Sequence, residues 1–183
     1  MTVKILTFDD VQQVVPVVED IVVIYREAFG QAPYFKNDAD VRSFTSVLPR
    51  HMQRDNFRCV VAREDDTQDI LGFAYGYTGE AGQWWHDLVI RKMTPEDADF
   101  WMTNVFEVVE LAVRPSALGR DYGGRIHDAL LQGLPHRTAA LSTYQVETSA
   151  SKMYEKRGWT TLLSNFIFPG YTEPYRIMGK MLR

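Results

Sequence analysis

Hydrophobic residues recur along the chain at strand spacing in some segments and at helix spacing in others. The apolar run at 2–7 predicts a strand. Apolar positions three and four residues apart over 11–29 predict a helix. Pro16 lies in the first turns of this helix, where proline either fits the helix start or kinks it. A second helix is predicted over 38–53.

The middle of the chain reads as a hairpin followed by a segment without clear periodicity. Residues 56–64 and 69–78 predict two strands, and the polar run between them predicts their turn. The segment 79–86 breaks the alternation and is interpreted as a loop. Thr94 followed by Pro95 is typical of a helix start, because proline fits the first helical position.

The second half of the chain alternates between strands and helices. Strands are predicted at 106–113, 139–143, 159–168 and 174–182. One helix is predicted through Ile126, Ala129 and Leu130, closed by Gly133 and Pro135, and another at 149–157. This order predicts a single α/β domain over residues 1–183, with a central, mixed and mostly antiparallel sheet flanked by helices.

Composition and charge narrow the class of protein. The chain has 183 residues, of which 45% are hydrophobic and 24% charged, as in soluble globular proteins. A net charge of −4 predicts neither nucleic acid nor an anionic membrane as a partner. No stretch approaches the roughly 20 apolar residues that cross a bilayer. The first residues lack the pattern of a signal peptide, so we expect a cytoplasmic protein.

The single cysteine and the four histidines indicate no disulfide, reactive thiol or metal site. Cys59 is the single cysteine, so an intramolecular disulfide and a site built on several thiolates are both excluded. It lies in an apolar run and is interpreted as a buried strand residue rather than a reactive thiol. The four histidines do not form a metal-ligand pattern, so no metal is predicted.

A strand, a loop with glycines and a helix follow one another at 106–133. A helix N-terminus leaves backbone N–H groups unpaired, and glycine lets that backbone approach a phosphate closely. The arrangement fits ATP, a dinucleotide or coenzyme A. A P-loop is excluded because no Gly-Lys-Ser/Thr follows the glycines. The spacing and the late position disfavour a dinucleotide-binding fingerprint.

Two motifs in this half of the chain narrow the choice. The first is Val113-Arg114-Pro115 followed by a loop with Gly119 and Gly123. About 30 residues further on, the second contains Ala150, Tyr154 and Gly158, with Glu147 before them and Trp159 after them. In this order the two motifs resemble the signatures of the GNAT superfamily of N-acetyltransferases.

The chain departs from these signatures at three positions. Leu118 stands where the family has Arg or Gln, and Asp121 stands at the first signature glycine. Glu147 replaces the usual Asn. A carboxylate at Asp121 would oppose a pyrophosphate unless its side chain points outward or caps the helix.

The resemblance implies acetyl-CoA as the co-substrate. It also implies that exposed backbone groups of the 106–113 strand hold the pantetheine and that the loop amides hold the pyrophosphate, with Arg120 or Arg125 adding positive charge. The implied coenzyme-binding residues are Leu111, Ala112, Val113, Leu118, Gly119, Arg120, Asp121, Tyr122, Gly123, Gly124, Arg125, Glu147 and Ala150.

Three residues are candidates for proton transfer. Tyr154 is the expected general acid for the departing thiolate, since the pKa of tyrosine, about 10, is close to that of a thiol. The alternative is an aromatic on the core face of its helix. Glu107 and Glu110 are base candidates on opposite faces of one strand. The alternative interpretation is that one of the two glutamates simply faces solvent or pairs with an arginine.

Aromatic residues mark the expected acceptor pocket, where they would hold an amine by cation–π contact. They are Tyr75, Tyr77, Trp84 and Trp85, with His86 as an alternative base. Core packing or a homodimer surface is the other interpretation of these residues.

The function predicted on this basis is N-acetylation of a small-molecule or peptide amine, by direct transfer in a ternary complex. No cysteine or serine lies in a nucleophile motif, which disfavours a covalent acetyl-enzyme. Transfer of a longer acyl chain, an O-acceptor and a GNAT-fold module that binds acyl-CoA without turnover remain as alternatives.

Overall fold

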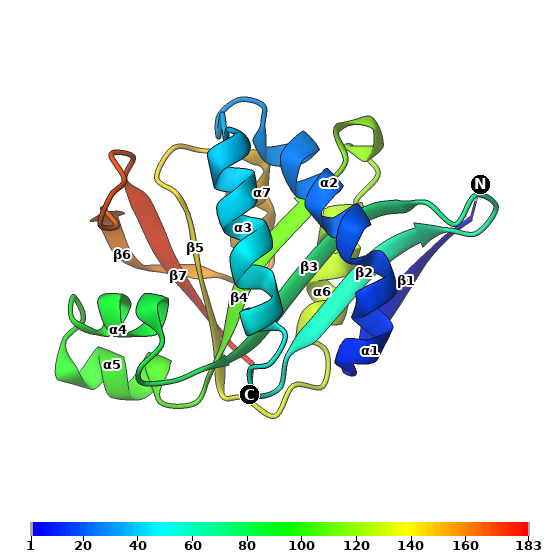
Figure 1. Cartoon of the computed structure of the whole chain (residues 1–183). Coiled ribbons are helices and arrows are strands. Elements are labelled where there is room, and N and C mark those ends of the chain that lie inside the picture. The colour runs from blue at the N-terminus through cyan, green and yellow to red at the C-terminus, as the bar shows by residue number, and fades with distance from the viewer. Residues whose placement is uncertain (1, 183) are drawn as a thin grey trace. The chain divides into compact units, whose positions relative to one another are not determined.

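The computed structural model describes residues 2–182 and contains one mixed sheet (Figure 1). Its strands are β1 (Val3–Phe8), β2 (Arg58–Glu64), β3 (Ile70–Gly79), β4 (Val105–Val113), β5 (Thr138–Tyr144), β6 (Thr160–Phe166) and β7 (Tyr175–Met181). They follow the order β1-β2-β3-β4-β5-β7-β6. β4 pairs with β5 in parallel, whereas β1–β2, β2–β3, β5–β7 and β6–β7 are antiparallel. The mixed, mostly antiparallel sheet is therefore as predicted.

Helices occupy most of the connections. They are α1 (Val11–Val14), α2 (Val18–Phe29), α3 (Asp38–His51), α4 (Trp84–Ile90), α5 (Pro95–Met102), α6 (Tyr122–Leu131) and α7 (Ser149–Lys156), with 3-10 turns η1 (Val15–Val17) and η2 (Pro115–Ala117). The helix predicted over 11–29 is thus interrupted by η1, which contains Pro16. Proline lacks an N–H and its ring clashes with the preceding turn, so the α-helix restarts after it.

The loop predicted at 79–86 is wrong in its second part, because α4 begins at Trp84. This helix has seven residues, too few for an apolar period to show in the sequence. It forms because Trp85, Leu88 and Val89 contribute to a hydrophobic core. Thr94 caps α5, with Pro95 at its first position, as predicted.

The described chain divides into two compact units, each built from two stretches of sequence. Unit 1 comprises the residues up to Tyr77 together with Val109–Gln132. Unit 2 comprises Thr78–Val108 and the residues from Gly133 onward. The division crosses β3 and β4, so each of these strands contributes to both units. A single domain over 1–183 stays a prediction.

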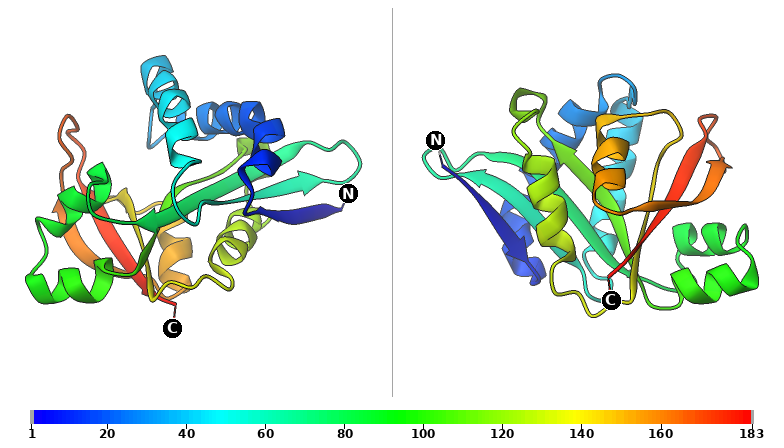
Figure 2. Two further views of the ribbon diagram at one scale, coloured as in Figure 1. Left: turned by 60° about the horizontal axis from the view of Figure 1, so that its bottom comes forward. Right: turned by 180° about the vertical axis from the view of Figure 1, so that it is seen from behind.

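In unit 1, α2 and α3 cover one face of β2 and β3, and α6 lies on the other face (Figure 2). The core between the helices and the strands is aliphatic and aromatic, and includes Ile21, Phe44 and Phe73. Cys59 belongs to this core and is fully buried, as predicted. Burial raises the pKa of its thiol to about 12, so the thiol stays neutral.

In unit 2, a second core joins α4 and α5 to residues of β4, β5 and β7, including Val89, Met102 and Ile177. α7 contacts β5. The parallel pairing of β4 with β5 begins at Val105↔Thr138 and ends at Glu107↔Ala140. No helix among residues 2–182 is both long enough and apolar enough to cross a membrane.

Candidate functional site

The loop after β4 leads into α6 without a side-chain cap. Asp121 occupies the N-cap position with φ 54°, in the left-handed region, and its side chain makes no cap hydrogen bond. The first N–H groups of a helix have no intrahelical acceptor. Those at the start of α6 are therefore available to an anion, and the helix dipole adds partial positive charge there.

Open space surrounds the crown of this loop. Gly119 has φ +78°, and a Cβ added to it would meet nothing within 4 Å. Leu118 is 61% exposed, and Arg120 and Asp121 are also exposed. Tyr122, in contrast, is buried and anchors the first turn of α6. The predicted phosphate-binding residues thus lie together around an open loop with a fixed helical end.

The two arginines assigned to this loop differ in their surroundings. Arg125 donates through Nη2 to the carbonyl of Val3, at 3.2 Å, and its guanidinium lies 5.9 Å from the ring centre of Tyr122. It therefore ties α6 to β1. Arg120 is exposed on the loop itself and is the better-placed candidate for a phosphate.

β3 contains a glycine, Gly72, that no sequence motif marked. A Cβ at Gly72 of β3 would come within 2.9 Å of the Ala112 carbonyl oxygen and within 3.0 Å of Ile126 Cδ1. Only glycine therefore lets β3, β4 and α6 approach so closely. An isolated glycine in an apolar strand was the available signal.

Glu110 of β4 is a residue of intermediate exposure whose carboxyl group is buried. Burial raises its pKa from 4.5 to about 8, and the positive charge of Lys36 opposes this shift. Both residues belong to unit 1. A carboxyl group that ionises near neutral pH, on a residue that keeps some accessible surface, has the properties of a general base.

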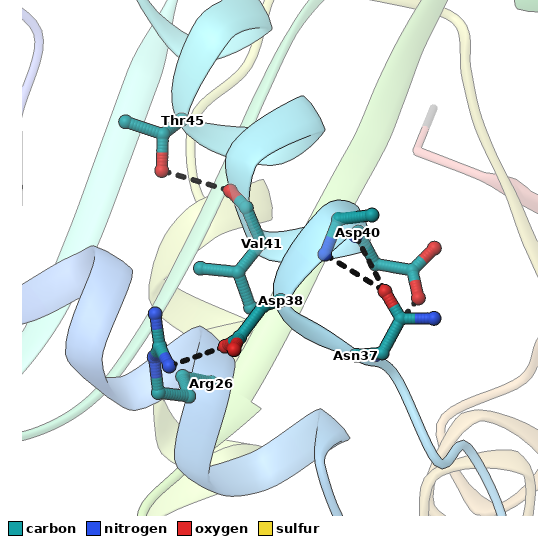
Figure 3. A network of polar contacts seen from close by, with 7 residues as sticks. Arg26, Asn37, Asp38, Asp40, Val41 and Thr45 are labelled. Atoms are coloured by element: carbon teal, nitrogen blue, oxygen red, sulfur yellow. Dashed lines mark hydrogen bonds and ion pairs between the residues drawn. The ribbon is translucent and has the colours of Figure 1, made fainter.

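Lys36 is held in place by the connection between α2 and α3. Its backbone N–H donates to the Phe29 carbonyl at 2.8 Å. The next residue, Asn37, forms a capping box with Asp40 at the start of α3 (Figure 3). Lys36 Nζ lies 3.9 Å from Asp40 Oδ1. Lys36, which no motif marked, is the cation whose charge opposes the rise in the pKa of Glu110.

Glu107 belongs to unit 2 and has a different environment. Its side chain is 4% exposed, and its backbone is in the parallel pairing, opposite Ala140. Glu107 is thus a buried strand residue, whereas Glu110 is partly accessible.

Tyr154 lies on α7 in unit 2 and is 7% exposed. Its ring packs edge-on against Trp159, with centroids 5.7 Å apart. The helix is fixed at its start by a capping box between Thr148 and Ser151. Glu147, just before the helix, is exposed and pairs with Lys152 at 2.7 Å. Glu147, at the family's Asn position, therefore forms an ion pair at the surface.

Tyr75 and Tyr77 are buried in unit 1 beside a histidine and an arginine. His51 Nδ1 lies 3.0 Å from the Tyr75 hydroxyl, and Arg54 lies 4.6 Å from the ring centre of Tyr77. Burial, followed by the charges of Arg54 and Arg50, lowers the pKa of His51 to about 4, which keeps it neutral. One ring face of Tyr77 is therefore already covered by a cation of the protein itself.

Trp84, Trp85 and His86 lie in three different environments in unit 2. Trp84 is 56% exposed and stacks on Phe168 at 5.5 Å. Trp85 donates to Ser142 Oγ at 3.3 Å. His86 is buried, and its Nε2 lies 3.2 Å from the Met102 carbonyl oxygen, which accepts a hydrogen bond from it. Of the three, Trp84 is the one that offers a free aromatic surface.

The sequence matches the model of the Acetyltransferase (GNAT) family over residues 18–159. A curated relative, the GCN5-like protein acetyltransferase Rv2170 of Mycobacterium tuberculosis (strain ATCC 25618 / H37Rv), is 33% identical over 129 residues. The match covers 66% of this chain and 63% of the relative, so the chain spans less than two thirds of that protein.

Solved structures show the same fold at low identity. Aminoglycoside 6'-acetyltransferase type Ii has a TM-score of 0.65 at 16% identity, over 100% of this chain and 98% of that one. The PaiA N-acetyltransferase of Thermoplasma acidophilum, in complex with coenzyme A, has a TM-score of 0.64 at 13% identity, over 99% of each chain.

Proposed function

The chain belongs to the GNAT acetyltransferase family, and from this premise we propose that it transfers an acetyl group from acetyl-CoA to an amine in a ternary complex. The observation that carries the proposal is the start of α6. Its first amide groups have no intrahelical acceptor and no side-chain cap. Such a helix end, next to an open glycine loop, fits a pyrophosphate.

Coenzyme A would be held mainly by backbone groups. The amides of 119–124 would bind its pyrophosphate, with Arg120 adding charge. The backbone of Leu111, Ala112 and Val113 would hold the pantetheine and the thioester carbonyl. The end of the β4–β5 pairing at Glu107↔Ala140, before these residues, supports this assignment.

We assign the base to Glu110 rather than to Glu107. Glu110 keeps accessible surface and has a pKa of about 8, whereas Glu107 is almost fully buried. A base is most effective when its pKa lies near the working pH. Glu110 would accept the proton of the amine, directly or through water, as nitrogen attacks the thioester carbonyl carbon.

Tyr154 would donate the proton that the departing sulfur needs. The new C–N bond forms while the C–S bond breaks, and the phenol proton neutralises the coenzyme thiolate. The proton taken up by the base balances this loss, so the reaction needs no further reactant. The capping box of α7 supports this role, since it holds the helix that carries Tyr154.

The acceptor is proposed as an amine on a small molecule or a peptide. The curated relative is named a protein acetyltransferase, and one structural neighbour is an aminoglycoside acetyltransferase. Trp84, with its exposed ring, would contact a cationic acceptor through cation–π attraction.

The test is release of free coenzyme A from acetyl-CoA in the presence of a panel of peptides, amino acids, aminoglycosides and simple amines. We expect release to depend on the amine, with an acetylated product of matching mass. If acetyl-CoA binds but no acceptor stimulates release, turnover is excluded for that panel. The alternative of a coenzyme-binding module, kept open by Leu118 and Asp121, would then replace the proposal.

A further inference from the structure

Arg114, the middle residue of Val-Arg-Pro, joins the start of the phosphate loop to two other elements of unit 1. Its Nε donates to the Ile70 carbonyl at 2.7 Å. Its Nη1 lies 2.8 Å from both carboxylate oxygens of Glu27 on α2, and Nη2 lies 4.0 Å from Asp20. Its backbone N–H donates to the Leu71 carbonyl at 2.8 Å. One side chain thus connects β3, α2 and the end of β4.

These contacts fix the base of the loop while its crown stays open. The Arg114 carbonyl accepts the Ala117 N–H at 2.9 Å, so η2 continues directly from the anchored residue. Gly119, by contrast, has open space around it. The direction in which the loop leaves β4 therefore depends on the Arg114 anchor.

A planar guanidinium that uses several nitrogens at once fixes orientation as well as position. Arg114 is 20% exposed, and Glu27 is 40% exposed. Screening at this exposure limits the pair's contribution to global stability. The geometry of the anchor therefore matters more than its ion-pair energy.

We propose that Arg114 is a positioning residue for the coenzyme: through Glu27 and Ile70 it orients the loop so that the amides of 119–124 converge on the pyrophosphate. This inference rests on the proposed function, because it assumes that the loop binds coenzyme A. In this role Arg114 would act through the loop and not by contact with the acetyl group or the acceptor.

Arg58 provides a matched control in the same unit. It pairs with Asp9 at 2.6 Å and donates to the Gln132 carbonyl at 2.7 Å, just beyond the C-terminal end of α6. Like Arg114, it combines a carboxylate partner with a carbonyl partner. Because it lies at the other end of the helix, its loss should affect folding stability without affecting the phosphate loop.

The experiment is calorimetry of coenzyme A binding to the full chain and to Arg114→Gln, Glu27→Gln, the double variant and Arg58→Gln. We expect Arg114→Gln to weaken binding about tenfold, equivalent to about 1.4 kcal/mol. Glu27→Gln should weaken it less, and the double variant no more than Arg114→Gln alone, because both changes break one anchor. In turnover, KM for acetyl-CoA should rise while kcat changes little.

Arg58→Gln should lower the melting temperature and leave coenzyme affinity unchanged. A folded Arg114→Gln protein with the original affinity would overturn the inference while leaving the proposed function intact. If Arg114→Gln does not fold, Glu27→Gln alone decides, and unchanged affinity in that variant also overturns it. If the unaltered chain binds no coenzyme A, both the proposed function and this inference fail.

Discussion

The helices that follow β4 and β5 begin in opposite ways. α7 starts with a capping box, in which the Ser151 N–H donates to Thr148 Oγ1 at 3.0 Å and the Thr148 N–H donates to Ser151 Oγ at 2.9 Å. α6 starts at Asp121, whose side chain makes no such bond. The side chains at the start of α7 satisfy the Thr148 and Ser151 amides, whereas no side chain caps the start of α6.

This difference separates two tasks. An uncapped helix start lowers stability unless another group satisfies the amides, so its presence beside a glycine loop favours a ligand as that group. The capped α7 is instead a firm carrier for Tyr154. Changes near the start of α6 should therefore alter coenzyme affinity, and changes on α7 should alter turnover or stability.

The largest effect is expected on the α7 side, at Tyr154. Tyr154→Phe keeps the ring that packs against Trp159 and removes the proton donor. We expect kcat to fall by about 10²–10⁴, the usual contribution of a positioned acid, with the affinity for acetyl-CoA preserved. Steady-state kinetics and calorimetry measure the two quantities. Unchanged turnover would show that Tyr154 is a core residue and not the general acid.

Glu110→Gln should give the next largest effect on turnover, and the size of this effect should depend on pH. With an acceptor amine of low pKa, kcat/KM should rise as pH passes through about 8, where Glu110 ionises. In Glu110→Gln this rise should be absent, with a loss of roughly 10² at the plateau. Glu107→Gln is the matched control and should keep the rise. If Glu107→Gln alone removes it, the base is Glu107.

The raised pKa of Glu110 should also make the free energy of unfolding depend on pH. Its folded-state pKa lies above 4.5, so stability is fully present below about pH 4.5 and is lost as pH rises toward about 8. Glu110→Gln removes this loss. Urea denaturation should show the variant equal to the unaltered protein at low pH and more stable at about pH 8.5. A constant difference at every pH would argue against the raised pKa.

The capping box of α7 should contribute a smaller, purely structural effect. Thr148→Ala should reduce the free energy of unfolding by about 1 kcal/mol, as loss of an N-cap usually does. Coenzyme affinity should not change. Thr148→Ser, which keeps the hydroxyl, is the control and should restore most of the stability. A large loss of coenzyme affinity in Thr148→Ala would contradict the assignment of coenzyme binding to the start of α6 and a purely structural role to the start of α7.

The smallest effect is expected at Asp121. Its side chain is exposed, and its backbone has φ 54°, in the left-handed region. Asp121→Gly also suits this backbone and removes the carboxylate. We expect coenzyme affinity to change by less than about tenfold, or 1.4 kcal/mol. A larger gain, measured by calorimetry, would show that the carboxylate faces the pyrophosphate.

Much of the fold could be predicted because its elements carry local patterns. β4 was expected at 106–113 and lies at Val105–Val113, and α7 ends one residue before its predicted end. The GNAT resemblance, drawn from two motifs, is confirmed by the family match. α4 was missed because a helix of seven residues has no visible period. η1 was not predicted as such, although Pro16 indicated an irregularity there.

The surroundings of the candidate site could not be predicted in the same way. Lys36 acts on Glu110, and Arg54 covers Tyr77, from segments distant in the sequence. No local spacing encodes such pairs, because folding alone brings them together. The pKa of Glu110 likewise depends on burial, which the alternation of one strand does not determine. The motif residues themselves stay predictions until they are tested.

The assignment of the phosphate site to the start of α6 is tested by calorimetry of coenzyme A binding to Gly123→Val. The added β-branched side chain would enter the space proposed for the pyrophosphate at the start of α6. Ala129→Val, further along the same helix, controls for the cost of valine in a helix. We predict that Gly123→Val weakens binding roughly 100-fold, or about 2.7 kcal/mol, and that Ala129→Val leaves affinity unchanged. Unchanged affinity in a folded Gly123→Val protein would contradict the assignment of the α6 start as the phosphate site.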